Sequence, residues 1–283
     1  MRVSTDGTVT TLGSVAGSSG VAGGEGGLLG IALAPGDDTV LYAYVTTATD
    51  DRVVRMDIGD SSLGEPEPIL TGIPIGSRHH GGRLLFDAEG ALFVSTGDAG
   101  TSKLPKIATR WLARCLDSIA TARPCRGNPF DNRTWSYGHR NIEGLAFDAD
   151  GRLWASEFGE KSADELNLIE RGGNYGWPQV EGTGGGDDLV DPQVTWATDD
   201  CSPAGIAITG STVFIGALQG ECLFAVPLDG ATAGKPVAHL AGKYGRIRSV
   251  AVAPDGALWV TTSNTDGRGD VRDGDDRILR VTV

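Results

Sequence analysis

Apolar residues in this chain occur in short runs that alternate with polar residues, and the runs come in pairs joined by turns rich in glycine and aspartate. A period of two along the sequence is typical of a half-buried β-strand, whereas an amphipathic helix repeats about every 3.6 residues. We therefore predict antiparallel hairpins along most of the chain. They cover residues 27–45, 82–97, 144–159, 204–220 and 249–263.

Three stretches within these hairpins have nearly the same sequence, which indicates an internal repeat. Each places a glycine in the turn, where the backbone needs a positive φ, and follows it with a leucine and an aromatic residue. These stretches are 86–94, 147–155 and 252–260. Several of the five hairpins are followed by a third alternating strand, at 52–56, 223–227 and 277–281. Hairpin units that recur about every 45–60 residues are typical of a β-propeller. We predict an all-β fold, a six-bladed β-propeller, with residues 1–283 as a single domain.

The two ends of the sequence predict an incomplete blade. Residues 2–12 have the pattern of the last two strands of a blade, and 277–281 is a third strand with nothing after it. A propeller normally closes by pairing its terminal strands, because an open sheet edge invites aggregation. We therefore expect the first or closing blade to be incomplete, and the natural chain to begin further upstream with any signal peptide.

One segment, 103–126, departs from the hairpin pattern. Its residues 104–126 are basic and amphipathic, which favours a helix at the place where the third strand of a blade is expected. We treat 103–126 as an atypical insertion in the predicted domain.

Charge and hydropathy exclude two classes of partner. The formal net charge is -13 at pH 7, so the surface as a whole repels nucleic acid and anionic lipid. No run of about 18 apolar residues occurs, which excludes a membrane-spanning helix from the prediction. The cysteines number 4, at positions 115, 125, 201 and 222, and an even number permits two disulfides without requiring them.

A histidine pair at the start of a predicted strand is the first candidate for chemistry. His79 and His80 precede Gly81 and Gly82, and histidine occurs only 4 times in the chain. Imidazole changes its charge near neutral pH, so a histidine here is a candidate general base. The alternative is that the pair simply caps a turn.

Six motifs in a fixed order resemble those of the soluble glucose/sorbosone dehydrogenase family. The resemblance covers nearly the whole chain except 103–126, and it implies a six-bladed propeller that oxidises aldose sugars with pyrroloquinoline quinone (PQQ) and calcium, passing electrons to an external acceptor. The motifs are Glu25-Gly26-Gly27-Leu28-Leu29-Gly30, His79-His80-Gly81-Gly82-Arg83-Leu84, Gly97-Asp98-Ala99-Gly100, Tyr137-Gly138-His139-Arg140-Asn141, Asp164-Glu165-Leu166-Asn167-Leu168-Ile169 with Gly173-Asn174-Tyr175-Gly176-Trp177-Pro178, and Gly245-Arg246-Ile247-Arg248.

The resemblance implies catalytic and sugar-binding roles for three residues. His79 matches the base that takes the proton of the anomeric hydroxyl while hydride passes to the quinone, and Asp98 is expected to orient it. Glu25 matches a polar residue that contacts the sugar, with a solvated loop carboxylate as the alternative.

The resemblance also implies how an anionic cofactor is held in an acidic protein. Arg140, Asn141, Arg246 and Arg248 match cofactor-binding positions, and guanidinium groups bind carboxylates in bidentate fashion. Arg246 and Arg248 lie two apart, so on a strand both point to one face, where solvent exposure is the alternative to cofactor binding. Calcium is expected against the backbone carbonyls of Gly159 and Glu160, since calcium prefers oxygen ligands.

Several features depart from the family pattern. Gln219 stands where the family commonly has a cation, and Glu143 introduces a carboxylate near the cofactor positions, which is unfavourable unless calcium or an arginine offsets it. When 105–126 is back-translated with GC-rich codons and read one base out of frame, the resulting amino-acid sequence resembles that of the family. We therefore hypothesise two compensating frame errors. Trp111, Cys115 and Cys125 would then be products of the shifted reading frame.

The location and function have defined alternatives. A disulfide between Cys201 and Cys222 would indicate export, so we expect an extracellular or periplasmic protein. The leading hypothesis is a PQQ-dependent sugar dehydrogenase. The alternatives are a family propeller without turnover that binds a glycan or protein partner, and a calcium-dependent lactonase propeller, which would hold its metal with side-chain carboxylates.

Overall fold

The computed structural model describes residues 1–4, 7–20, 24–101, 113–118, 123–124 and 128–283, and this part of the chain is all-β. Its 22 strands form six antiparallel sheets, with no α-helix among the described residues. Most strands pair with their neighbours in sequence, which is the up-and-down order of a propeller blade. The chain contains two compact units, Met1–Trp135 and Ser136–Val283.

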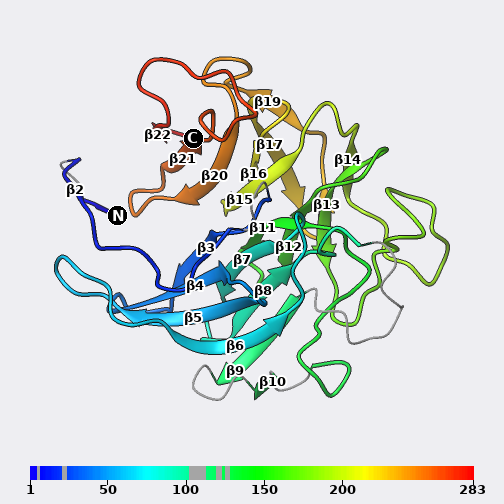
Figure 1. Cartoon of the computed structure of the whole chain (residues 1–283). Coiled ribbons are helices and arrows are strands. Elements are labelled where there is room, and N and C mark those ends of the chain that lie inside the picture. The colour runs from blue at the N-terminus through cyan, green and yellow to red at the C-terminus, as the bar shows by residue number, and fades with distance from the viewer. Residues whose placement is uncertain (5–6, 21–23, 102–112, 119–122, 125–127) are drawn as a thin grey trace. The chain divides into compact units, whose positions relative to one another are not determined.

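The first unit contains three sheets and one apolar core between two of them (Figure 1). Its strands are β1 (Arg2–Val3) with β2 (Val9–Thr10); β3 (Leu28–Leu33), β4 (Val40–Thr46), β5 (Asp51–Asp57) and β6 (Glu67–Ile73); and β7 (Gly81–Phe86), β8 (Leu92–Thr96), β9 (Ala113–Ser118) and β10 (Arg123–Pro124). Tyr44 of β4 and Leu92 of β8 are fully buried in this core. The core therefore packs the sheet that contains β4 against the sheet that contains β8.

The second unit also contains three sheets, and its cores lie between successive sheets (Figure 1). Its strands are β11 (Ile142–Phe147), β12 (Leu153–Glu157), β13 (Asp164–Ile169) and β14 (Val194–Trp196); β15 (Pro203–Thr209), β16 (Thr212–Ala217), β17 (Cys222–Asp229), β18 (Thr232–Ala233) and β19 (Val237–His239); and β20 (Ile247–Val252), β21 (Leu258–Thr262) and β22 (Ile278–Val281). Trp154 is fully buried between the first two of these sheets.

The repeated hairpin sequences form the same turn in both units. Asp87 Oδ1 accepts a hydrogen bond of 2.7 Å from the amide of Ala91, and Asp148 Oδ1 accepts one of 2.9 Å from the amide of Arg152. The turn glycine has φ +87° at Gly90, where a residue with a Cβ would be strained. The aspartate side chain thus binds the backbone of the turn, and the glycine adopts the positive φ that the turn needs. These two requirements explain why the short sequence repeats.

The helix predicted for 104–126 is wrong where the structure describes that segment. Ala113–Ser118 is strand β9, which pairs antiparallel with β8 from Leu92↔Leu116 to Ser95↔Ala113. The open edge of β8 offers unpaired backbone groups, and satisfying them outweighs a local helical pattern. The third strand expected of this blade is therefore present, and the other residues of the segment except β10 lie outside the described part.

The predicted fold class, an all-β propeller, is confirmed, and no helix in the described ranges has the length and apolarity needed to cross a bilayer. The ends match their predicted local patterns: β1 pairs with β2, and β22 is the third strand of its sheet. A single domain over 1–283 and an incomplete closing blade stay predictions.

Candidate functional site

His79 lies in a strained loop immediately before β7. Its φ is +60°, which is uncommon for a residue with a Cβ, and Gly81 continues in the same region with φ +64°. The carbonyl of His79 accepts a hydrogen bond of 3.1 Å from the amide of Ala99. A Cβ at Gly81 would lie 2.6 Å from the backbone of Thr96, so only glycine permits this approach. Strained backbone of this kind concentrates at functional sites.

Asp98 orients the His79 ring. The distance between His79 Nδ1 and Asp98 Oδ1 is 2.7 Å, and both side chains are buried. The same carboxylate oxygen accepts a hydrogen bond of 2.8 Å from the amide of Gly100. Because a carboxylate only accepts, a neutral imidazole in this pair carries its proton on Nδ1, which leaves the Nε2 lone pair as the basic atom.

Glu25 and His80 both help to hold this loop in place. Glu25 Oε2 accepts a hydrogen bond of 2.9 Å from the amide of His79, so its carboxylate holds the loop although the residue is exposed. His80 Nδ1 lies 2.8 Å from Asp51 Oδ2, and Tyr44 donates to the same oxygen at 3.2 Å. His80 and Asp51 are buried in the structure, so this second pair also holds the loop in place.

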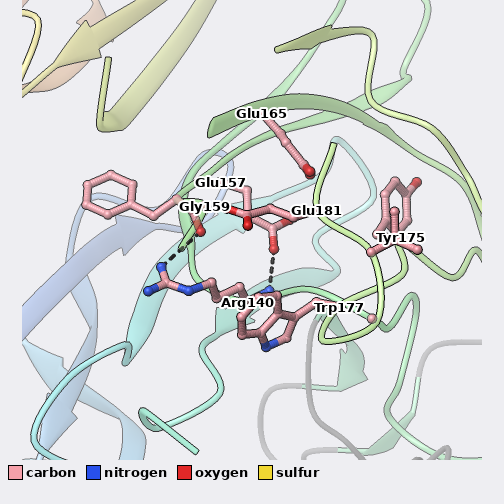
Figure 2. Close-up of a pocket in the computed structure, with 10 residues that line it drawn as sticks. Arg140, Glu157, Gly159, Glu165, Tyr175, Trp177 and Glu181 are labelled. Carbon is pink, nitrogen blue, oxygen red and sulfur yellow. Dashed lines mark hydrogen bonds between the residues drawn. The ribbon is translucent and has the colours of Figure 1, made fainter. Parts of the chain in front are cut away.

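In the second unit, Arg140 contributes its guanidinium to a pocket shown in Figure 2. Its amide donates to the carboxylate of Glu157, and its Nη1 donates to the carbonyl of Phe158 at 3.1 Å. Its guanidinium carbon lies 5.5 Å from the centre of a Trp177 ring. The arginine is therefore buried and held in a fixed direction, as a site for an anion requires.

Asn141, Glu143 and Arg248 form one polar chain near Arg140. Asn141 Nδ2 donates to Glu143 Oε1 at 3.0 Å, and Arg248 Nη1 lies 2.9 Å from Glu143 Oε2. The charge of the Glu143 carboxylate, which departs from the family pattern, is thus offset by the guanidinium of Arg248.

The premise that Arg246 and Arg248 point to one face of a regular strand is wrong. Strand β20 begins at Ile247, and the register shifts between Ile247 and Ser249, so Arg246 precedes the strand and Arg248 lies in the irregularity. Arg246 donates instead to the carbonyl of Ser263 and to Asp266, both at 3.2 Å. A shift of one residue breaks the two-residue period on which the premise depended.

Gly159, the first of the two residues predicted to contact calcium, lines the same pocket as Arg140 (Figure 2). Asp164 Oδ1 accepts from the amide of Gly159 at 2.9 Å, and Glu181 Oε1 accepts from the amide of Glu160 and from that of Lys161, the latter at 2.9 Å. Burial, partly offset by hydrogen bonds from Gly159 and Ser202, raises the pKa of Asp164 to about 6. Each part of this loop is therefore fixed by a carboxylate.

Sequence reasoning missed the acidic residues of this pocket. Glu157 and Glu165 are direct partners across β12 and β13, and Asn167 Nδ2 donates to both carboxylates, at 3.3 Å and 3.0 Å. Burial, and then the charge of Glu157, raise the pKa of Glu165 to about 8. The signal was available, because pairing the hairpin at 153–169 brings these two glutamates side by side.

We expect Glu165→Gln to remove a pH dependence of stability. The folded state keeps a proton on Glu165 from about pH 4.5 to about pH 8 that the unfolded chain has lost, so stability falls as the pH rises through this window. Glutamine resembles the protonated acid and does not ionise. The variant should be more stable than the wild type by roughly 1–3 kcal/mol near pH 9 and about equal to it near pH 5.

Urea denaturation in a chelator, at several pH values, measures this difference. Glu170→Gln, which removes an exposed carboxylate, is the control and should follow the wild type at every pH. A gap between Glu165→Gln and the wild type that stays constant with pH would contradict the prediction.

Cys201 and Cys222, the pair whose disulfide would indicate export, are not bonded to each other in the structure. Both residues are buried free cysteines in one cluster with Ala217. Cys222 begins β17 directly opposite Ala217, so its cross-strand partner is the alanine. Burial raises the pKa of Cys222 to about 11 and raises that of Cys201 further, so both are thiols at neutral pH. Cys125 lies outside the described residues, as does the side chain of Cys115.

Comparisons with known proteins agree with these motifs. The family model described as Glucose / Sorbosone dehydrogenase matches residues 1–279. The structure of a PQQ-bound aldose sugar dehydrogenase from Streptomyces coelicolor is 46% identical, with a TM-score of 0.94, over 99% of this chain and 86% of that one. Aldose sugar dehydrogenase YliI of Escherichia coli is 27% identical over 87% of this chain and 76% of that protein.

Quinoprotein glucose dehydrogenase B of Acinetobacter calcoaceticus is 30% identical over 57% of this chain, a match that spans 41% of that protein. The predicted site residues divide between the two units: Glu25, His79 and Asp98 lie in the first, and Arg140, Asn141, Gly159, Glu160, Arg246 and Arg248 lie in the second. With its family model matched from residue 1 to 279, the chain belongs to the glucose/sorbosone dehydrogenase family.

Proposed function

We propose that this protein is a PQQ- and calcium-dependent dehydrogenase that oxidises aldose sugars to lactones. The observation that carries the proposal is the buried His79 imidazole, held at 2.7 Å by Asp98 in a strained loop. The relatives named as sugar dehydrogenases, and the PQQ-bound form of one of them, support the substrate class and the cofactor. An external electron acceptor would reoxidise the cofactor.

The residues of the second unit fit an anionic cofactor. Arg140 is a buried guanidinium flanked by Trp177, which suits a flat carboxylate-bearing group. Arg246 and Arg248 add two more cations, each shared with an acidic partner. PQQ, when bound, supplies the quinone that accepts a hydride.

The donor chemistry of the 159–160 loop fits a hard cation. Among the described residues, no group of three or more His, Cys, Asp or Glu side chains is arranged to hold a metal ion. The loop offers backbone carbonyl oxygens, and calcium accepts such ligands readily. A side-chain carboxylate cage, which a lactonase propeller would need, is not favoured.

His79 performs the proton transfer in this proposal. Its Nε2 takes the proton of the anomeric hydroxyl as the hydride leaves the anomeric carbon, so the sugar loses two electrons and two hydrogens and becomes a lactone. Asp98 holds the ring and stabilises the imidazolium that forms. Glu25 has two tasks here, holding the amide of His79 and contacting the sugar hydroxyls.

Reconstitution tests the proposal. Chelator-treated protein is mixed with PQQ and CaCl2, and reduction of a redox dye is followed with a panel of aldoses. We expect reduction only when PQQ, calcium and an aldose are all present. Protein that binds PQQ, as shown by quenching of tryptophan fluorescence, yet reduces no dye with any aldose would favour the alternative of a family propeller without turnover.

A further inference from the structure

Two carboxylates bind every backbone N–H group from residue 159 to residue 163. Asp164 accepts from Gly159 at 2.9 Å, and Glu181 Oε1 accepts from the next four residues, Glu160, Lys161, Ser162 and Ala163. The distances to the last two amides are 3.1 Å and 3.3 Å. Glu181 Oε2 also accepts from Ser162 Oγ at 2.7 Å. One side chain therefore collects five donors from a single loop.

These hydrogen bonds determine where the carbonyls of the loop point. In a trans peptide the N–H of one residue and the C=O of the residue before it point in opposite directions. The described cis peptides are Trp177-Pro178 and Asp275-Asp276, so the peptides of this loop are trans. Because Glu160 and Lys161 donate to Glu181, the carbonyls of Gly159 and Glu160 must point away from it.

The carboxylate of Glu181 lies at the N–H end of four successive peptides of this loop. A negative charge at the N–H end of a peptide polarises the group and makes its carbonyl oxygen a stronger donor to a cation. The charge of Glu181 thus acts on the side of the loop opposite to its carbonyls.

The first position of this loop, residue 159, has no room for a side chain. A Cβ on Gly159 would lie 2.1 Å from the carbonyl oxygen of Ala163 and 2.5 Å from Glu181 Oε1. The turn therefore closes on itself and on Glu181 together, and its geometry is fixed before any ligand binds.

We propose that Glu181 is a positioning residue for calcium, which holds the carbonyls of Gly159 and Glu160 outward as a preformed pair of ligands. The inference rests on the proposed function, because the calcium site belongs to it. Glu181 does not coordinate the ion itself. It acts through the peptides that it binds, as outer-shell partners of metal ligands do.

A calcium titration tests this role. Chelator-treated protein is held at a fixed concentration of PQQ, CaCl2 is added stepwise, and binding of PQQ is followed by quenching of tryptophan fluorescence. We expect Glu181→Gln to raise the half-saturating calcium concentration roughly 10–100-fold, and Glu181→Ala to raise it at least as much. At saturating calcium both variants should bind PQQ as the wild type does, because the ligands themselves remain.

Asp188→Asn is the matched control, since it removes one exposed carboxylate seven residues further along the same segment. It should leave the half-saturating concentration unchanged. If Glu181→Gln also leaves it unchanged while the wild type requires calcium, the positioning role is overturned and the proposed function stands. If PQQ binding by the wild type does not depend on calcium, the calcium part of the proposed function fails, and this inference fails with it. Circular dichroism of Glu181→Gln checks that it folds.

Discussion

His79→Gln should reduce the kcat for aldose oxidation by about 10²–10⁴-fold while PQQ still binds. The variant keeps a neutral polar side chain in the strained loop but has no basic nitrogen to accept the hydroxyl proton. Its backbone contacts, the hydrogen bonds to Glu25 and Ala99, involve main-chain atoms and survive the change. Dye reduction measures kcat, and tryptophan quenching measures PQQ binding on the same sample.

Two further variants show whether the loss belongs to this imidazole. His239→Gln changes an exposed histidine of β19 and should leave kcat unaltered. Asp98→Asn keeps the ring but removes the carboxylate 2.7 Å from Nδ1, so it should lower kcat less than His79→Gln and change the pH profile of kcat. Retention of more than about a tenth of the wild-type kcat in His79→Gln would exclude it as the general base.

The hairpins of the fold were predictable because the residues that form each turn lie close together in the sequence. The hairpins at 86–94 and 147–155 need only an aspartate whose side chain closes the turn and a glycine with positive φ, and both are readable from the sequence. The helix predicted at 104–126 failed for the opposite reason. Strand β9 depends on the open edge of β8, a partner that no window of sequence around β9 contains.

Residues of the candidate site were predictable only where they lie inside a short sequence motif. His79 and Arg140 stand inside compact motifs, and the structure places each in a buried, fixed position. Glu181 was missed because its five donors lie about 20 residues earlier, across a turn that the pattern does not describe. A regular strand would place Arg246 and Arg248 on one face, but a shift in register gives each a separate partner.

Arg140→Ala should weaken PQQ binding about 100-fold, since a charge-assisted hydrogen bond contributes roughly 1.5–3 kcal/mol and more when it is bidentate. Arg140→Lys keeps the charge but loses the planar fork, so its affinity should fall between the two. Arg171→Ala, an exposed arginine of the same unit, is the control and should bind PQQ as the wild type does. Fluorescence quenching by PQQ at saturating calcium gives the dissociation constants of the wild type and the three variants.

Glu143→Gln should raise the affinity for PQQ, whereas Arg140→Ala should lower it. Opposite effects of removing a negative and a positive charge are expected only if charge complementarity holds the cofactor. The carboxylate of Glu143 now engages Arg248 at 2.9 Å, and its charge opposes an anionic cofactor. An amide in its place keeps an oxygen for Asn141 Nδ2 but releases the guanidinium, so affinity should rise by about tenfold. The same titration measures it. If Arg140→Ala and Glu143→Gln both weaken binding by similar factors, the two residues serve to shape the unit, and charge complementarity with a carboxylate-bearing cofactor is not what holds PQQ there.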